Sequence, residues 1–265
     1  MAWIHDYPSW LVGVATIAIF VAIAFAGLAV SRQWSRNRGL HALVDNTVIG
    51  WIFSAILGIY AIAIGLIAVA CWSNATAATS VASHEAAAIA AFYRDLGGYP
   101  ATPRGDLQGM LTEYTRYVIE EAWPSQRRGV VPHGGTEILN RLQRTLFAFE
   151  PATESEKIVH GETLQAYNRV IEYRRQRLEA VEYAVPGTLW SVVLIGAAIA
   201  VVASFVFNME SFQVHALMSC SLAAMIGLLV FFIMISDLPY RGARSVGPDA
   251  YALVLRDLIE HHSTP

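Results

Sequence analysis

The chain has 265 residues, of which 55% are hydrophobic and only 15% are charged, and its mean hydropathy is +0.44. Because an ordinary soluble domain carries roughly 25% charged residues, this composition excludes a disordered chain and argues against a soluble globule. The formal net charge of −3 argues against nucleic-acid binding, which relies on clustered positive charge. We therefore expect a protein of the lipid bilayer without a nucleic-acid partner.

Four apolar runs organise the chain. They cover residues 11–30, 48–72, 188–207 and 216–236, and none contains Asp, Glu, Lys or Arg. Each has about 20 residues or more, which is enough for a helix to cross a hydrocarbon core of roughly 30 Å. The sequence therefore predicts an all-α membrane protein with four transmembrane helices.

The segments between these runs divide the chain into four parts. Residues 1–72 hold the first two membrane helices, 73–185 form a polar insert of domain size, 186–236 hold the last two membrane helices, and 237–265 form a C-terminal tail. An even number of crossings puts both termini and the insert on the same side of the membrane. The larger number of arginines on that side favours the cytoplasm.

The insert is predicted to be a helical extramembrane bundle. Residues 73–96 are rich in alanine and continue the second membrane helix, and further helices are expected over residues 103–123 and 136–149. Thr153 and Glu156 have the spacing of a capping box, so a fourth, long helix starts there and runs to about residue 183. No strand pattern interrupts this series.

Three of these helices carry one charged residue within an apolar face, namely Glu85, Glu121 and Arg174. A buried charge is costly unless it is paired and hydrogen-bonded. We therefore expect Arg174 to meet Glu85, Glu121 or both, with Arg177, one turn further on, as a second candidate partner. This buried ionic cluster either fixes the helix register alone or couples the bundle to the membrane helices, in which case Arg174→Leu disturbs assembly or gating.

Motifs for enzyme chemistry are incomplete. His84-Glu85 begins like the zinc motif H-E-x-x-H, but Ala88 stands where the second histidine is needed. His133-Gly134-Gly135 is similar to an oxyanion loop, yet no G-x-S-x-G accompanies it. We expect no enzyme, no catalytic residue, no cofactor and no metal site.

One face of the second membrane helix carries small residues beside a tryptophan. Trp51, Ser54, Gly58, Ala61 and Gly65 follow one another at helical spacing. Such a face allows close packing between helices. It also suits a pore whose apolar constriction gates by dewetting. Because four helices seldom enclose a pore, the second alternative needs several subunits.

The order of features along the chain resembles a family of prokaryotic membrane proteins termed bestrophin-like. The matching elements are Glu85-Ala86 after the second helix, Tyr117 with Glu121 and Trp123, Arg174 with Arg177 and Leu178, Pro186 and Trp190 before the third helix, and an exit motif after the fourth helix formed by Asp237, Pro239 and Gly242. The resemblance covers nearly the whole chain and rests on the pattern rather than on any single element.

This resemblance extends more loosely to the true bestrophins, which are pentameric anion channels with four membrane helices per subunit and cytosolic termini. It implies a homo-oligomer, with the pentamer as the form that bestrophins take, a pore lined by the second helix, and inorganic ions such as chloride as partners. It also implies a bacterial inner membrane with termini and insert in the cytoplasm. Asp237 stands apart from other acids, so the acidic calcium clasp of bestrophins is not expected.

Two functions of different classes follow from the sequence. The first is a homo-oligomeric, anion-conducting channel with its pore lined by the second helix. The alternative is a non-conducting membrane scaffold or sensor whose helical domain binds a partner. In the alternative, the second helix buries its small-residue face within one subunit. The oligomeric state discriminates between the two, because a stable monomer in detergent excludes the channel and a ring-like oligomer with the second helix facing the axis favours it.

Overall fold

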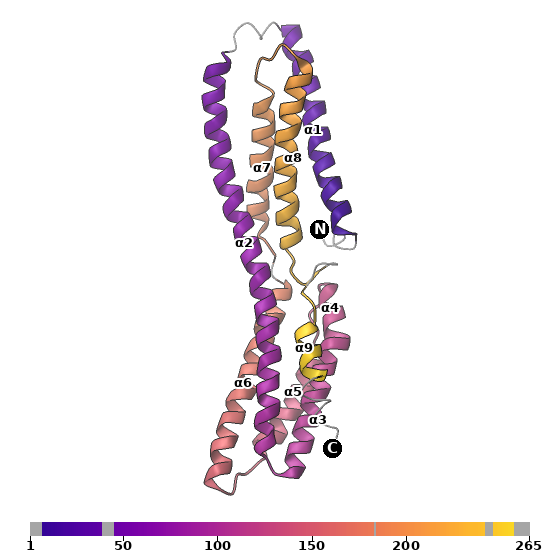
Figure 1. The fold of residues 1–265 in the computed structure, drawn as a ribbon, viewed down its shortest axis with the longest axis vertical. Coiled ribbons are helices and arrows are strands. Elements are labelled where there is room, and N and C mark those ends of the chain that lie inside the picture. Colours follow the sequence, from indigo (N-terminus) through magenta and orange to yellow (C-terminus); the bar gives the residue numbers. More distant parts are fainter. Residues whose placement is uncertain (1–6, 39–44, 183, 242–245, 257–265) are drawn as a thin grey trace. The chain divides into compact units, whose positions relative to one another are not determined.

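The computed structural model describes residues 7–38, 45–182, 184–241 and 246–256, and these residues contain helices and no strand. The chain divides into two compact units (Figure 1). Unit 1 comprises Met1–Asn74 and Ala184–Asp237, and unit 2 comprises Ala75–Tyr183 and Leu238–Pro265. Both units are therefore assembled from segments that are far apart in the sequence.

Within the residues that the structure describes, four helices are long and apolar enough to cross a membrane, as predicted. They are α1 (Ser9–Arg38), α2 (Asn46–Asp95), α7 (Gly187–Ser204) and α8 (Phe212–Ser236). The expected continuation of the second membrane helix into the polar insert is confirmed, because α2 is a single helix of 50 residues. The fold is thus an all-α membrane protein.

Glycines allow the helices of unit 1 to approach closely. A Cβ atom added at Gly227 of α8 would lie 3.2 Å from the Ile17 Cα and 3.3 Å from the Phe20 Cβ of α1. At Gly196 of α7 an added Cβ would meet the ring of Tyr60 of α2, whose hydroxyl donates to the Val193 carbonyl at 3.1 Å. Without a hydrophobic driving force in lipid, such close contacts and interhelical hydrogen bonds hold membrane helices together.

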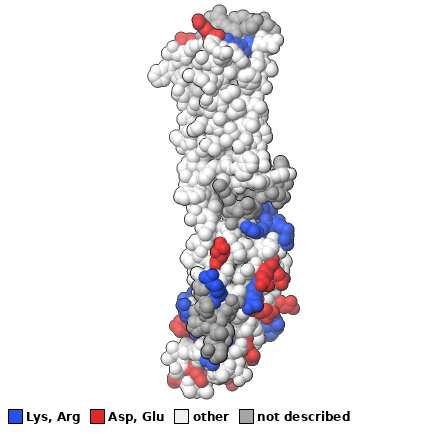
Figure 2. All heavy atoms as spheres, turned by 45° about the vertical axis from the view of Figure 1, so that its right-hand side comes forward, with Lys and Arg blue, Asp and Glu red and all other residues white. Residues whose placement is uncertain are grey.

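Polar contacts gather at one end of unit 1. The Arg32 Nη2 atom donates to the Glu210 carbonyl at 2.7 Å, and Asn46 and Asn208 exchange two hydrogen bonds of 2.7 and 2.9 Å. These bonds join the end of α1 and the start of α2 to the loop between α7 and α8. Figure 2 shows charged side chains at this end of unit 1 and a surface almost free of them along the rest of the unit.

Unit 2 is a helical bundle with an apolar core. It contains the last part of α2, the short turn Leu96–Gly98, α3 (Ala101–Tyr117), a π-helical turn η4 (Val118–Ala122), α4 (Trp123–Arg127), α5 (Gly135–Phe147), α6 (Glu154–Glu182) and α9 (Asp249–Val254). Fully buried Ile89, Phe92, Leu111, Leu142 and Val170 belong to its core. These apolar residues come from α2, α3, α5 and α6, so each of these helices buries one face.

The capping box predicted at the start of α6 is confirmed. The Glu156 amide donates to Thr153 Oγ1 at 3.2 Å, and the Thr153 amide donates to Glu156 Oε2 at 3.1 Å. Glu156 Oε2 also accepts from the Ala152 amide at 2.7 Å. These bonds satisfy amides that the first helical turn leaves without a partner.

We predict that Gly227→Val destabilises unit 1, because its methyl groups would press against the α1 backbone. Overpacking of this kind costs about 1–3 kcal/mol, so the midpoint of thermal unfolding in detergent should fall. Gly50→Val is the matched control, since nothing lies within 4 Å of a Cβ added at Gly50. Equal unfolding midpoints for the two variants would contradict the close approach of α1 and α8.

Candidate functional site

The small-residue face of α2 is open in the single chain. Trp51 is 77% exposed, Ser54, Gly58 and Ala61 are exposed, and Gly65 is half-buried. A Cβ added at Gly58 or Gly65 would meet no atom within 4 Å. Among the described residues, no other helix therefore uses this face as a close-packing surface.

The other sides of α2 have different surroundings. Tyr60, Ile64 and Cys71 are buried in the core of unit 1, together with residues of α7 and α8. A second exposed side carries bulky apolar residues, among them Ile59 (73% exposed) and Ile62 (67% exposed). In one subunit α2 thus has a packed face, a bulky apolar face and a face of small residues.

In unit 2 the Glu85 carboxylate is fully buried and accepts four hydrogen bonds. Its Oε2 atom accepts from Arg177 Nε at 2.6 Å and from the Tyr251 hydroxyl at 2.9 Å. Its Oε1 atom accepts from the Tyr114 hydroxyl at 2.7 Å and from Arg177 Nη2 at 3.2 Å. Two acceptor sites on each oxygen are therefore occupied, which is the full capacity of a carboxylate.

The guanidinium group of Arg177 is enclosed by aromatic rings. It lies 5.5 Å from the centre of the Trp123 ring and 5.9 Å from that of Tyr251. Burial by itself would lower the pKa of Arg177, but the Glu85 carboxylate and the two tyrosines outweigh it and raise this pKa well above its usual value. Arg177 therefore stays charged beside the Glu85 carboxylate.

The two tyrosines act as fixed hydrogen-bond donors. Burial, and next the negative charge of Glu85, raise the pKa of Tyr114 and of Tyr251 well above the ordinary tyrosine value. Their hydroxyl groups consequently keep their protons across the neutral and moderately alkaline range. The centre formed by Glu85, Arg177, Tyr114 and Tyr251 is hereafter called the Glu85 centre.

The structure corrects two members of the expected ionic cluster. Arg177, the second candidate, is the partner of Glu85, whereas Arg174 is half-buried and donates to Thr136 Oγ1 at 2.8 Å. Both arginines lie on the same side of α6, one turn apart. The apolar repeat of α6 identifies this side of the helix. It does not show which turn of α6 lies at the same height as Glu85 of α2.

Glu121 is exposed, so its expected burial is wrong. The reason is the π-helical turn at Val118–Ala122, which has more residues per turn than an α-helix and rotates the face that follows it. Ala122 at the end of this turn and Trp123 and Gln126 beyond it are buried instead. The 3.6-residue period used to predict the face of Glu121 does not apply there.

The exit motif after α8 connects several segments. The Asp237 carboxylate accepts hydrogen bonds from the Val185 amide and, at 3.2 Å, from Trp190 Nε1, both at the entry to α7. The Pro239 carbonyl accepts from the Val246 amide at 3.0 Å. Gly242 lies outside the described residues. Asp237 thus ties the end of α8 to the start of α7.

The C-terminal segment, expected to be a tail, supplies core residues of unit 2. Tyr240 is buried, and its hydroxyl donates to the Ala78 carbonyl at 3.1 Å, while Trp123 Nε1 donates to the Val246 carbonyl at 2.8 Å. Sequence reasoning missed Tyr251. Its only signal is the short stretch after Pro248 that forms α9, which is too short for a helical period to be recognised.

No group of three or more His, Cys, Asp or Glu side chains that could hold a metal ion occurs among the residues that the structure describes. The chemistry available at the Glu85 centre is that of a buried ion pair whose carboxylate has all its acceptor sites occupied. The chemistry available at the small-residue face of α2 is that of apolar side chains, one hydroxyl and exposed helix backbone.

Comparisons with known proteins agree on one family. The sequence pattern of the Bestrophin-like domain matches residues 18–251. Two crystal structures of a bacterial bestrophin homologue from Klebsiella pneumoniae, each with one substitution, superpose with TM-scores of 0.72 and 0.71 at 13% and 14% identity. Both alignments cover 95% of this chain and 99% of that chain. A crystal structure of a substituted membrane protein gives a TM-score of 0.72 at 13% identity with the same coverage. Such identities establish a shared fold, and no curated protein matches the sequence.

We predict that Arg177→Leu strongly destabilises unit 2, because it leaves the Glu85 carboxylate buried without a counter-charge. Removing one partner of a buried ion pair costs about 3–5 kcal/mol. Arg174→Leu, the same substitution one turn earlier, should cost less, about 1.5 kcal/mol, since it removes one hydrogen bond of a charged group to a neutral hydroxyl and leaves no buried charge unpaired. Thermal unfolding followed by circular dichroism compares the two, and a greater loss for Arg174→Leu would contradict the assignment of the pair.

Proposed function

This chain belongs to the Bestrophin-like family, and from that premise we propose that it is a homo-oligomeric ion channel whose pore is lined by α2. The observation that carries the proposal is the open small-residue face of α2. Trp51, Ser54, Gly58, Ala61 and Gly65 lie along it, and no other helix in the part of the chain that the structure describes covers it.

This observation favours the channel over the scaffold. A scaffold that buries the small-residue face within one subunit would bring another helix close to Gly58 and Gly65, yet an added Cβ at either position meets nothing. The open face is therefore available to other copies of the chain or to water. Several copies arranged around α2 would enclose a pore that one subunit cannot form.

The chemistry of α2 suggests how such a pore would conduct. From Asn46 to His84 the helix contains no Asp, Glu, Lys or Arg. Ions would pass a constriction of small, mostly apolar residues with one hydroxyl, Ser54, and such a constriction closes by dewetting. The absence of acidic side chains removes a barrier to anions. Anion conduction and a pentameric ring are carried over from the resemblance to bestrophins.

The proposal puts residues 73–185 outside the bilayer and, with both termini, in the cytoplasm of a bacterial cell. The charged side chains over unit 2 in Figure 2 support a watery environment for that unit. The Glu85 centre then fixes the geometry of the extramembrane bundle, including the last part of α2. No enzymatic reaction and no cofactor enter the proposal.

The first test is electrical. The purified protein, reconstituted in a planar bilayer under a KCl gradient, should give a current whose reversal potential has the sign for chloride. Its mass in detergent should be that of an oligomer. A monomer, or an intact oligomer that passes no current, would shift the assignment to the scaffold or sensor.

The second test locates the pore on α2. In a background where the native Cys71 and Cys220 are replaced by alanine, we predict that a charged, water-soluble methanethiosulfonate blocks most of the current through Gly58→Cys. The reagent attacks thiolates only in water, so Gly58→Cys should react within the conducting pathway. Ile59→Cys is the control, because Ile59 is also exposed but lies on the bulky apolar side. Block at Ile59→Cys alone would assign the pore to that side instead.

A further inference from the structure

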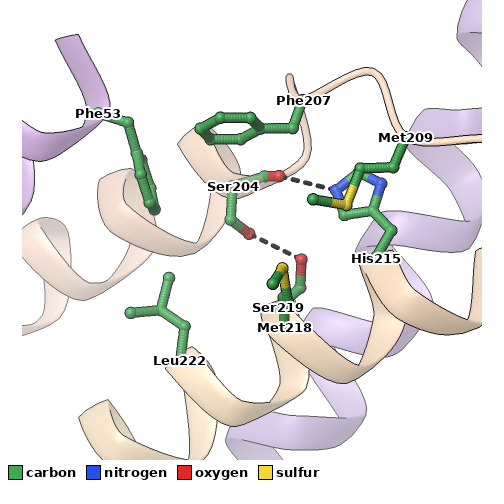
Figure 3. A pocket seen from close by; sticks show the side chains of 8 residues that line it. All are labelled: Phe53, Ser204, Phe207, Met209, His215, Met218, Ser219 and Leu222. Carbon is green, nitrogen blue, oxygen red and sulfur yellow. Dashed lines mark hydrogen bonds between the residues drawn. The ribbon is translucent and has the colours of Figure 1, made fainter. Parts of the chain in front are cut away.

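A cavity of about 170 Å³ lies at the end of unit 1 where α7 passes into α8 (Figure 3). Its apolar walls are Phe53 of α2, Phe207 and Met209 of the loop, and Met218 and Leu222 of α8. Met218 is 57% exposed, so the cavity opens to the outer surface of the unit. A molecule dissolved in the surrounding lipid can therefore reach it.

The size and walls of this cavity suit one aromatic ring. An engineered apolar cavity of about 150 Å³ in another protein binds benzene, which is a little smaller than the space here. The rings of Phe53 and Phe207 meet edge to face, with centres 5.2 Å apart and planes at 82°. Two methionine sulfurs complete the walls, and thioethers make favourable contacts with aromatic rings.

One wall is polar, and its hydrogen bonds can be assigned completely. Ser204 Oγ lies 2.7 Å from the Val201 carbonyl, which can only accept, so the single hydroxyl hydrogen of Ser204 is used there. The Ser204 and Ser219 hydroxyl oxygens lie 3.2 Å apart. Because the Ser204 hydrogen is committed to the Val201 carbonyl, we assign the hydrogen of this contact to Ser219. With that assignment, no residue that the structure describes donates to Ser219 Oγ.

His215 holds this wall in place. Its Nε2 atom lies 2.9 Å from the Ser204 carbonyl, and since a carbonyl oxygen only accepts, Nε2 carries the proton and donates. Ser204, His215 and Ser219 are all buried. The end of α7 is thus tied to the start of α8, and the Ser219 oxygen is left as the acceptor at the cavity wall.

We propose that this cavity is a binding site for a small aromatic alcohol, with its ring between the phenylalanine and methionine side chains and its hydroxyl donating to Ser219 Oγ. A hydrocarbon chain of a lipid would fill the apolar walls but leave the Ser219 acceptor without a donor. Matching this acceptor distinguishes an alcohol from a plain hydrocarbon. The proposal concerns binding and does not depend on ion conduction.

The test uses benzyl alcohol that carries an aryl diazirine on the intact protein in nanodiscs. Irradiation should label residues of the cavity walls, as mapped by mass spectrometry, and unlabelled benzyl alcohol should compete in a saturable way. In Ser219→Ala, the concentration of benzyl alcohol that halves the labelling should rise about fivefold, the value of one neutral hydrogen bond. The corresponding concentration of toluene should not change.

Two further variants complete the design. Ser191→Ala, which removes an exposed hydroxyl elsewhere on α7, should leave both competitors unaffected. Leu222→Trp should fill the cavity and abolish the labelling while the unfolding midpoint is retained. If Leu222→Trp fails to fold, the contrast between benzyl alcohol and toluene in Ser219→Ala still decides the question.

Three results would overturn the proposal. The first is labelling that does not saturate or that spreads evenly over the outer surface of unit 1. The second is an equal effect of Ser219→Ala on benzyl alcohol and toluene, which would remove the hydroxyl from the recognition. The third is competition by octane as strong as that by benzyl alcohol, which would assign the cavity to hydrocarbon chains of lipids.

Discussion

The burial of one carboxylate imposes the strongest constraint on unit 2. A charge as deeply buried as Glu85 costs several kcal/mol unless other groups replace the lost water. Arg177, Tyr114 and Tyr251 supply that replacement, and they come from α6, α3 and α9. Because the bonds are short and directional, four segments must meet at one point. An apolar core alone tolerates small shifts between helices, whereas this centre specifies a single arrangement.

The sequence was sufficient to predict much of the fold. The four apolar runs identified the membrane helices, and the Thr153–Glu156 spacing gave the start of α6. A charge within an apolar stripe also marked Glu85 as buried, because such a charge needs a partner whatever the fold. These inferences succeeded because each depends on spacing along one helix and on the free-energy cost of one group: an exposed apolar side chain, an unpaired amide at a helix end or a buried charge.

The remaining parts of the Glu85 centre depend on non-local geometry. Arg174 and Arg177 share one side of α6, and only the relative height of the helices selects Arg177. Glu121 lies within a π-helical turn, which the residue pattern does not predict. Tyr251 comes from a six-residue helix 166 positions away from Glu85 along the chain. The spacing of residues along a helix cannot predict the choice of Arg177, the position of the π-helical turn or the contact between Tyr251 and Glu85.

Unit 1 is held together differently, and this affects how its exposed residues are interpreted. A bulky apolar side chain such as Ile59 has a similar free energy in lipid and in a protein core. Its exposure on α2 therefore does not indicate a protein partner. Small residues gain little free energy from contact with lipid, but they allow two helix backbones to approach closely. Gly196 and Gly227 are used in that way, each filled by a side chain or backbone of another helix. Gly58 and Gly65 have no such neighbour. Contacts within one chain therefore give no reason for the small residues on this face of α2. Contact with other copies of the chain or with water would supply one.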